Sequence, residues 1–313
     1  MKKILVFLSF ILLFLTANTQ SNNTSVIKIT GTKFPFAIMQ KWIDTYSKTH
    51  PGVVFELSKS IPLDSADLMI AAHAFKPREL KDEVTIVAVN RYAQLPIVNS
   101  NRIDLKHLQQ KGFTQQDLKN IFFADKENKT DGLNNPFTIY KRNKKVCASR
   151  SFAENVTGSQ LEIYGVGVTG DDRSLSAAVK NDLNGISYNN LGLVYNIQTR
   201  KVADSIAVIP IDINENGAID SDEKNYSTLD SVLDFLYKTK STKIPQENVN
   251  VVFNKNNPNK AAIDFLKWII TEGQQYNRVY GFLNLDKSVA REEQAFLNTI
   301  LKNNNNTVSV KNE

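Results

Sequence analysis

The sequence has a single cysteine, Cys147, so a disulfide bond within the chain is excluded. Its histidines are His50, His73 and His107, and no two of them lie at the spacing of a metal site. A G-x-S-x-G nucleophile motif is absent, and Ala153 stands where a phosphatase-type loop would place an arginine after Cys147. We therefore expect a protein that is not an enzyme, with Cys147 as a packed or surface thiol.

The sequence also lacks a large excess of charge of either sign. The 38 Lys and Arg residues exceed the 32 Asp and Glu residues by a formal charge of +6, which falls to +4 without Lys2 and Lys3. Basic residues form no stripe interleaved with aromatic residues, so we expect no nucleic-acid partner. The 42% hydrophobic residues are sufficient to build the core of one large domain or of two smaller ones.

Only one long apolar run occurs, and it lies at the start of the chain. Lys2 and Lys3 precede Ile4–Leu15, which is apolar except for Ser9 and is shorter than a membrane span. We expect residues 1–20 to be a cleaved signal peptide, with a membrane-anchored N-terminus as the alternative. Because no cysteine follows the run, a lipoprotein anchor is not expected. The expected location is periplasmic or secreted.

The rest of the chain alternates strand-like and helical segments. A β-like run covers residues 26–30, a turn follows, and Ile38, Trp42 and Tyr46 then recur at helical spacing after Pro35. The apolar segment ADLMIAA reads as a buried strand. A helix is expected from Thr114 over FTQQDLKNIFFA, and a long amphipathic helix over KAAIDFLKWIITEGQQYNRVYGF. This alternation predicts an α/β fold.

One loop has the spacing of a calcium site. Residues 212–223 read DINENGAIDSDE, with oxygen-bearing residues at alternating positions and Gly217 at the sixth position, where a sharp turn is needed. The expected Ca²⁺ ligands are Asp212, Asn214, Asn216, the backbone carbonyl of Ala218, Asp220 and Glu223. A strand-like segment precedes the loop and no second loop accompanies it, so we expect structural calcium and no sensor. A polar loop without metal is the alternative.

Several segments together resemble the phosphate-binding periplasmic proteins of ABC transporters. ITGTKFPFAIMQKWIDTYSKTHPGV is similar to their opening strand, turn and helix, and AAIDFLKWIITEGQQYNRVYGFLNL is similar to their C-terminal helix. The resemblance covers most of residues 26–286. It implies a two-lobed type II periplasmic binding protein fold with a ligand cleft between the lobes. Lobe I would comprise residues 24–95 and 205–301, with the calcium loop, and lobe II residues 96–204. Residues 302–313 are Asn-rich and are expected to be disordered.

The turn after the first strand is a candidate anion site. Backbone N–H groups are free where a strand leads into a helix N-terminus, and Thr32 adds a hydroxyl there. The resemblance implies further ligand contacts from Arg142 and from the turn that follows it. The candidate ligand-binding residues are Thr32, Lys33, Phe34, Ser60, His73, Arg142 and Ser149.

The sequence departs from the family pattern at several of these contacts. Val146, Cys147 and Ala148 stand where the family has a Ser-Gly-Thr turn, and Ala72 or His73 where it has an aspartate. The resemblance implies a monomer that captures phosphate or another small oxyanion for an ABC transporter permease. The alternative is a relative that has lost phosphate and acts as a sensor or as an accessory protein of the envelope.

Overall fold

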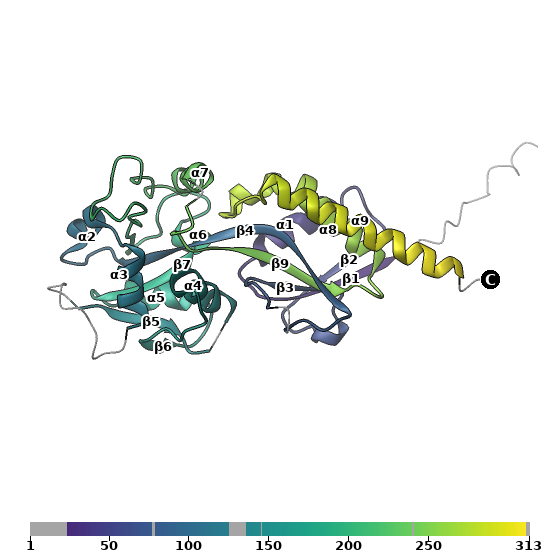
Figure 1. Cartoon of the computed structure of the whole chain (residues 1–313), viewed down its shortest axis with the longest axis horizontal. Helices are drawn as coiled ribbons and strands as arrows, with labels where there is room; N and C mark the ends of the chain where they lie inside the picture. The colour runs from purple at the N-terminus through teal and green to yellow at the C-terminus, as the bar shows by residue number, and fades with distance from the viewer. Residues whose placement is uncertain (1–23, 77–78, 125–135, 145, 240, 311–313) are drawn as a thin grey trace, which may run out of the picture.

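The computed structural model describes residues 24–76, 79–124, 136–144, 146–239 and 241–310, with side chains through residue 302. These residues form two lobes side by side along the long axis of the molecule (Figure 1). Each lobe has its own cluster of buried apolar side chains, which includes Ile27, Trp42 and Phe265 in lobe I and Phe113, Phe152 and Leu233 in lobe II. The expected signal peptide lies outside the described residues.

Lobe I is a mixed sheet covered by helices. Helix α1 buries Ile38, Trp42 and Tyr46, as their spacing predicted. The elements of lobe I are β1 (Ser25–Gly31), α1 (Phe36–Tyr46), β2 (Val53–Leu57), the 3-10 turn η1 (Leu63–Ser65), β3 (Leu68–Ala71), the first part of β4 (Val84–Asn99), β9 (Gln246–Asn254), α8 (Lys260–Thr271), the 3-10 segment η4 (Glu272–Tyr280) and α9 (Lys287–Val310).

Lobe II is a second mixed α/β unit. Its elements are the last part of β4, α2 (Leu105–Lys111), α3 (Gln115–Phe122), β5 (Thr138–Arg142), α4 (Cys147–Thr157), β6 (Val166–Val168), α5 (Asp172–Lys180), β7 (Gly185–Asn190), α6 (Leu191–Val194), β8 (Ile206–Val208) and α7 (Leu229–Thr239). Helix α3 begins at Thr114, as expected, because Thr114 and Asp117 form a reciprocal capping box. Helix α4 ends before Gly158, which adopts the left-handed conformation.

Two strands join the lobes. The strand order is β2-β1-β3-β9-β4-β7-β5-β6, with β8 also paired to β4. Strand β4 pairs antiparallel with β9 along Val84–Ala93, then continues into lobe II, where Gln94–Val98 pair with β7 and Ile97–Asn99 with β8. One long strand therefore belongs to both lobes.

The long C-terminal helix predicted from the sequence is divided. Helix α8 ends at Thr271, and the chain continues as the tighter 3-10 segment η4. At this point the backbone of Gly273 passes close to the indole of Trp42, whose Nε1 donates a 2.8 Å hydrogen bond to the Gly273 carbonyl oxygen. A side chain at residue 273 would meet the indole ring at 3.1 Å, so the close contact favours glycine.

Two expected boundaries differ from the structure. Residues 206–244 pack in lobe II, not in lobe I, because β8 pairs with the lobe II end of β4 and anchors the segment that follows. The chain returns to lobe I only through β9. The tail expected to be disordered from residue 302 continues as helix α9 to Val310, where the amphipathic repeat that buries Leu297 and Ile300 has already formed several turns.

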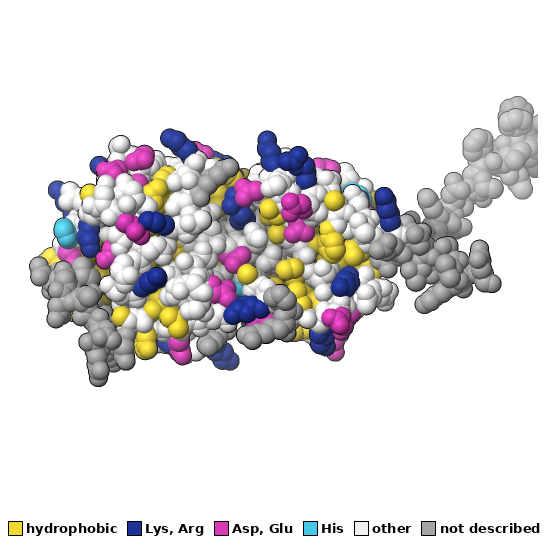
Figure 2. Space-filling model, in the orientation of Figure 1, with side chains coloured by type: hydrophobic (Ala, Val, Ile, Leu, Met, Phe, Trp, Pro, Cys, Tyr) yellow, Lys and Arg dark blue, Asp and Glu magenta, His cyan; other side chains and the backbone are white. Residues whose placement is uncertain are grey.

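The described surface carries charge of both signs. Lys and Arg side chains are interspersed with Asp and Glu side chains over both lobes on the face that Figure 2 shows. Among the described residues, no helix combines the length and the apolar character that crossing a membrane requires.

Candidate functional site

A cleft of about 860 Å³ lies between the two lobes. Its lining comes from the β1–α1 turn and the end of β3 in lobe I, and from the β5–α4 segment, the start of α5 and the β7–α6 junction in lobe II. Most of these segments follow the carboxyl ends of strands, which is where open α/β sheets bind ligands. Of the candidate residues, the cleft brings together Thr32, Lys33, Phe34, His73, Arg142 and Ser149.

The β1–α1 turn differs in one respect from the expectation. The backbone N–H of Thr32 is not free, because it donates a 2.9 Å hydrogen bond to the Ile70 carbonyl oxygen. Gly31 has a φ of +114°, and a side chain there would collide with the backbone of Ile70, so glycine lets the turn stay against β3. Thr32 therefore offers the cleft its hydroxyl and not its amide.

Phe34 and Lys33 form two different parts of the lobe I wall. The ring of Phe34 packs edge-on against Tyr92 with 4.9 Å between centroids and stacks with Phe282 at 6.0 Å. Lys33 reaches across to lobe II, where its Nζ lies 3.8 Å from a carboxylate oxygen of Asp171. Phe34 is thus a rigid wall, while Lys33 is half exposed and contributes a positive charge paired with Asp171 across the cleft.

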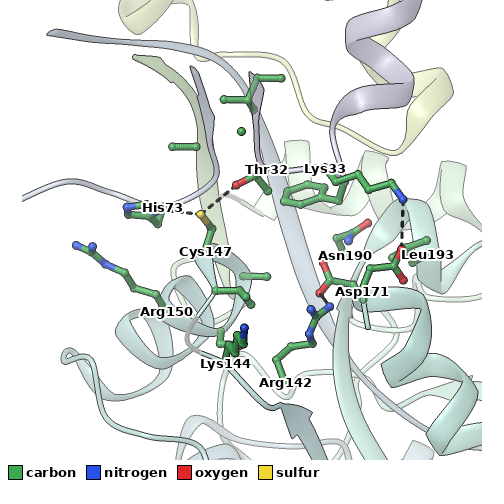
Figure 3. Close-up of a pocket in the computed structure, with 18 of the residues that line it drawn as sticks. Thr32, Lys33, His73, Arg142, Lys144, Cys147, Arg150, Asp171, Asn190 and Leu193 are labelled. Atoms are coloured by element: carbon green, nitrogen blue, oxygen red, sulfur yellow. Dashed lines mark hydrogen bonds and ion pairs between the residues drawn. The ribbon is translucent and has the colours of Figure 1, made fainter. Parts of the chain in front are cut away.

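Cys147 lies between His73 and Thr32, and Figure 3 shows its sulfur linked to both side chains. Its Sγ lies 3.0 Å from His73 Nδ1 and 3.1 Å from Thr32 Oγ1. Burial opposes ionisation of the thiol, but hydrogen bonds from His73 and Thr32 outweigh it and lower the pKa of Cys147 to about 7. The interpretation of Cys147 as an ordinary thiol therefore misses a three-residue cluster.

Arg142 enters the cleft already paired. Its Nη1 donates a 3.1 Å hydrogen bond to Asp172, and its Nη2 donates to the Gly170 carbonyl oxygen. Its Nε is buried and has no hydrogen-bond partner among the described residues. Burial raises the pKa of Asp172, although the charge of Arg142 partly offsets this effect. The sequence pattern found Arg142 but gave no sign of the carboxylate beside it.

Further positive charge lines the lobe II wall at Lys144 and Arg150. Arg150 forms a two-pronged contact with Glu79 of lobe I, at 2.8 and 3.2 Å, and lies 3.4 Å from Glu154. The hydrogen bonds from Arg150 hold the pKa of Glu79 at about 2. This ion pair crosses from one lobe to the other.

The two candidate serines have different positions. Ser149 lines the cleft, and its Oγ accepts a 2.8 Å hydrogen bond from the hydroxyl of Tyr188. Ser60 is not among the residues that line the cleft. It is exposed, with its Oγ 2.7 Å from that of Ser58, so its expected role in ligand binding is not supported. The segment after β2 is held against β1 instead, where the Ser58 backbone N–H donates to the Ile29 carbonyl oxygen and the Thr30 hydroxyl donates to the Ile61 carbonyl oxygen.

The loop of residues 212–223 lies in lobe II, away from the cleft lining. Asp212 and Glu223 are fully buried, at 0% and 1% exposure. Asp212 accepts hydrogen bonds from the backbone of Glu215 and Gly217, and Glu223 accepts from the backbone of Ile213, Asn214 and Asp220. The side-chain amides of Asn214 and Asn216 both donate to Asp220. The described residues hold no cluster of three or more His, Cys, Asp or Glu side chains placed for a metal.

The chain matches no protein-family model and no curated protein. Its fold, however, matches solved structures of phosphate-binding proteins. An ABC-type phosphate transport receptor from Vibrio cholerae is 13% identical over 83% of this chain and 100% of its own, with a TM-score of 0.58. A putative phosphate ABC transporter substrate-binding protein with bound phosphate, from Clostridium perfringens, is 17% identical over 84% and 100% of the two chains, with a TM-score of 0.60.

A possible phosphate binding protein from Planctomyces limnophilus covers 89% of this chain and 99% of its own, at 14% identity and a TM-score of 0.53. At identities this low, the structural match establishes the fold and not the ligand. The chain has the two-lobed periplasmic binding protein fold of these proteins, and its cleft lies between the lobes.

Proposed function

We propose that this protein is an exported, monomeric solute-binding protein. It captures phosphate or a related small oxyanion between its lobes and delivers the anion to an ABC transporter permease. The supporting observation is that the N-termini of α1 and α4, one from each lobe, both open on the cleft at Phe36 and Cys147. Neither helix end has a side-chain cap. Uncapped helix N-termini favour an anion through their N–H groups and dipoles.

The side chains around these helix ends complement an oxyanion. Thr32 and Ser149 supply hydroxyl groups, and Arg142 and Lys144 supply positive charge from lobe II. A guanidinium binds an oxyanion through paired hydrogen bonds. Contacts from both lobes would then hold the ligand, so binding favours closure.

Among small oxyanions, the carboxylate of Asp172 favours phosphate over sulfate as the ligand. A carboxylate on the wall of an anion site repels a fully ionised ligand, but it can accept a hydrogen bond from a ligand that carries a proton. Hydrogen phosphate carries such a proton near neutral pH and sulfate does not. We therefore expect the pair of Arg142 and Asp172 to select a protonated oxyanion.

Calorimetric titration of phosphate into the mature protein, unfolded and refolded to remove bound ligand, tests the proposal. One-to-one binding is expected, and Arg142→Ala should weaken it by about 2 kcal/mol, roughly 30-fold. Arg291→Ala, in α9 away from the cleft, is the matched control and should bind as wild type does. Absence of binding by wild-type protein, or equal binding by Arg142→Ala, would contradict the proposal.

We also propose that residues 212–223 bind a structural Ca²⁺ ion. The fit rests on the donor set, because the two carboxylates at the ends of the loop are buried and the carboxylate of Asp220 contacts Asn214 and Asn216, each of which also carries an amide oxygen. These oxygen ligands suit a hard cation. The ion would tie β8 to α7 within lobe II, and the oxyanion would bind elsewhere.

A further inference from the structure

The thiol of Cys147 is a part of the cleft that oxyanion capture does not require. It is partly buried and lines the cleft, so a small solute can reach it. His73 and Thr32 approach it from lobe I, within hydrogen-bond distance of Sγ. A cysteine with an imidazole and a hydroxyl at contact distance has the arrangement of an activated nucleophile and not that of a buried structural thiol.

Three features stabilise the thiolate over the thiol. The imidazole of His73 and the hydroxyl of Thr32 can each donate a hydrogen bond to the sulfur. Cys147 is also the first residue of α4, an eleven-residue helix whose N-terminus has no side-chain cap. The hydrogen bonds from His73 and Thr32, together with a backbone hydrogen bond from Ala72 and the charge of His73, outweigh burial and leave the pKa of Cys147 at about 7.

The same sulfur joins the two lobes. Cys147 begins a helix whose Phe152 and Val156 belong to the core of lobe II, yet its side chain packs against the core of lobe I. Next to it, Ser151 donates a 3.1 Å hydrogen bond to the Ala72 carbonyl oxygen across the same junction. Any atom added to Sγ therefore enters a contact between the lobes.

We propose that Cys147 is an oxidation site, at which hydrogen peroxide converts the thiolate to a sulfenic acid and so disturbs the contact between the lobes. The sulfur attacks one peroxide oxygen, an S–O bond forms and the O–O bond breaks. The sulfur loses two electrons and the peroxide gains them. The leaving hydroxide takes the proton from the His73 imidazolium and departs as water, and His73 regains a proton from solvent.

The sulfenic acid has no second thiol to react with within the chain, because Cys147 is the only cysteine. It cannot form an intrachain disulfide, so its reversal requires an external thiol. The first thiol displaces water and forms a mixed disulfide, and a second thiol releases the reduced Cys147 and a small-molecule disulfide. The site is thus reversible in the presence of thiols and persistent without them.

Oxidation should also weaken oxyanion binding, a consequence that rests on the proposed function. The added oxygen lies beside the Thr32 hydroxyl and at the N-terminus of α4, two groups that the proposal assigns to the anion. The sulfenic acid would compete for these donors and hold the lobes apart. Reduction should restore binding.

The first test needs no variant. The mature protein is treated with hydrogen peroxide at pH 6 in the presence of dimedone, which traps sulfenic acids, and labelling is followed by intact mass. The same reaction is run on protein unfolded in urea. The native thiolate fraction is about 30-fold higher and its nucleophilicity about fivefold lower, so native protein should react about sixfold faster. Equal or slower labelling of native protein would overturn the proposal.

Variants then locate the cause. His73→Ala and Thr32→Val should each slow labelling of the native protein, and Cys147→Ser should abolish it. His107→Ala, on the exposed face of α2, is the matched histidine control and should label at the wild-type rate. Circular dichroism checks that each variant folds, and His73→Gln replaces His73→Ala if the latter does not. A His73 variant that folds and labels at the wild-type rate would contradict the proposed role of the imidazole.

Phosphate titration of freshly oxidised and re-reduced protein separates the two proposals. Weaker binding after oxidation that dithiothreitol reverses supports the coupling, and unchanged binding overturns it. If neither form binds phosphate, the proposed function fails, while the labelling rates still decide whether Cys147 is an oxidation site.

Discussion

The guanidinium of Arg142 and the carboxylate of Asp172 form a 3.1 Å ion pair on the wall of the interlobe cleft. Both side chains are mostly buried, with 13% and 14% exposure. Breaking such a pair from one side leaves an uncompensated charge, so the two residues act as a unit. An anion that enters the cleft must therefore satisfy Arg142 in the presence of a fixed negative charge.

Asp172→Asn should narrow the discrimination between phosphate and sulfate. The amide oxygen of asparagine can still accept from Arg142, while the negative charge that repels a fully ionised ligand is lost. We expect sulfate binding to strengthen by roughly tenfold, about 1.4 kcal/mol, relative to phosphate. Calorimetry with both anions measures this, and Asp264→Asn in α8 is the control. Unchanged sulfate affinity in Asp172→Asn would contradict the proposed role of the carboxylate.

Alkylation of Cys147 should follow a titration near neutral pH. Because the folded thiol has a pKa of about 7, below its ordinary value, the iodoacetamide rate should rise as the pH increases through about 7 and then level off. In His73→Ala the midpoint should move upward, because a hydrogen bond to the thiolate is lost. Rates measured between about pH 5 and 9 test both statements. A wild-type midpoint near that of unfolded protein would be the contrary result.

Glu223→Gln should weaken calcium binding and lower the melting temperature without abolishing oxyanion binding. Calcium at 100 times its Kd would stabilise the folded state by about 2.7 kcal/mol, or roughly 5 °C for a chain of this size. Glu215→Gln is the matched control, because Glu215 lies in the same loop but pairs with Lys243 at its surface. Wild-type protein that melts at the same temperature in excess calcium and in chelator would show that the loop holds no structural metal.

Thr114→Ala should destabilise the folded protein by about 1 kcal/mol. Its hydroxyl accepts a 3.0 Å hydrogen bond from the backbone N–H of Asp117, and the Asp117 carboxylate accepts from the backbone N–H of Thr114. The alanine variant keeps the backbone N–H of residue 114 that donates to Asp117, but it leaves the Asp117 backbone N–H without its acceptor. Urea denaturation measures the loss, and Gln116→Ala, at an exposed position of the same helix, should change stability far less. Equal effects of the two substitutions would count against the capping argument.

Local features of the fold were predictable from short stretches of sequence. The capping residue Thr114, the terminating Gly158 and the buried face of Ile38, Trp42 and Tyr46 each depend on neighbours within a few residues. The placement of residues 206–244 was not predictable in this way. It depends on the pairing of Ile97 with Val208, which lie far apart in the chain.

The candidate site was predictable in its positions but not in its chemistry. Thr32 and Arg142 follow from strand ends and from the resemblance, and both line the cleft. The contact between His73 and Cys147, however, joins residues 74 positions apart, and neither residue lies in a sequence motif that predicts the contact. Asp172 is hidden for the same reason, because its position as the first residue of α5 gives no sign of Arg142, which lies 30 positions earlier in the chain.

The strand that both lobes share also determines how they can move. Strands β4 and β9 form an antiparallel ribbon, hydrogen-bonded along Val84–Ala93, whose register shifts between Ala88 and Asn90. A two-stranded ribbon resists in-plane bending, which stretches its hydrogen bonds, but it twists easily. The connection between the lobes therefore favours rotation by twisting of the ribbon over hinge bending. The bulge near residue 89 lies within the core of lobe I, and β4 passes from that core to the core of lobe II between Tyr92 and Ala93, so the proposed ligand capture would change the twist of the ribbon near those two residues.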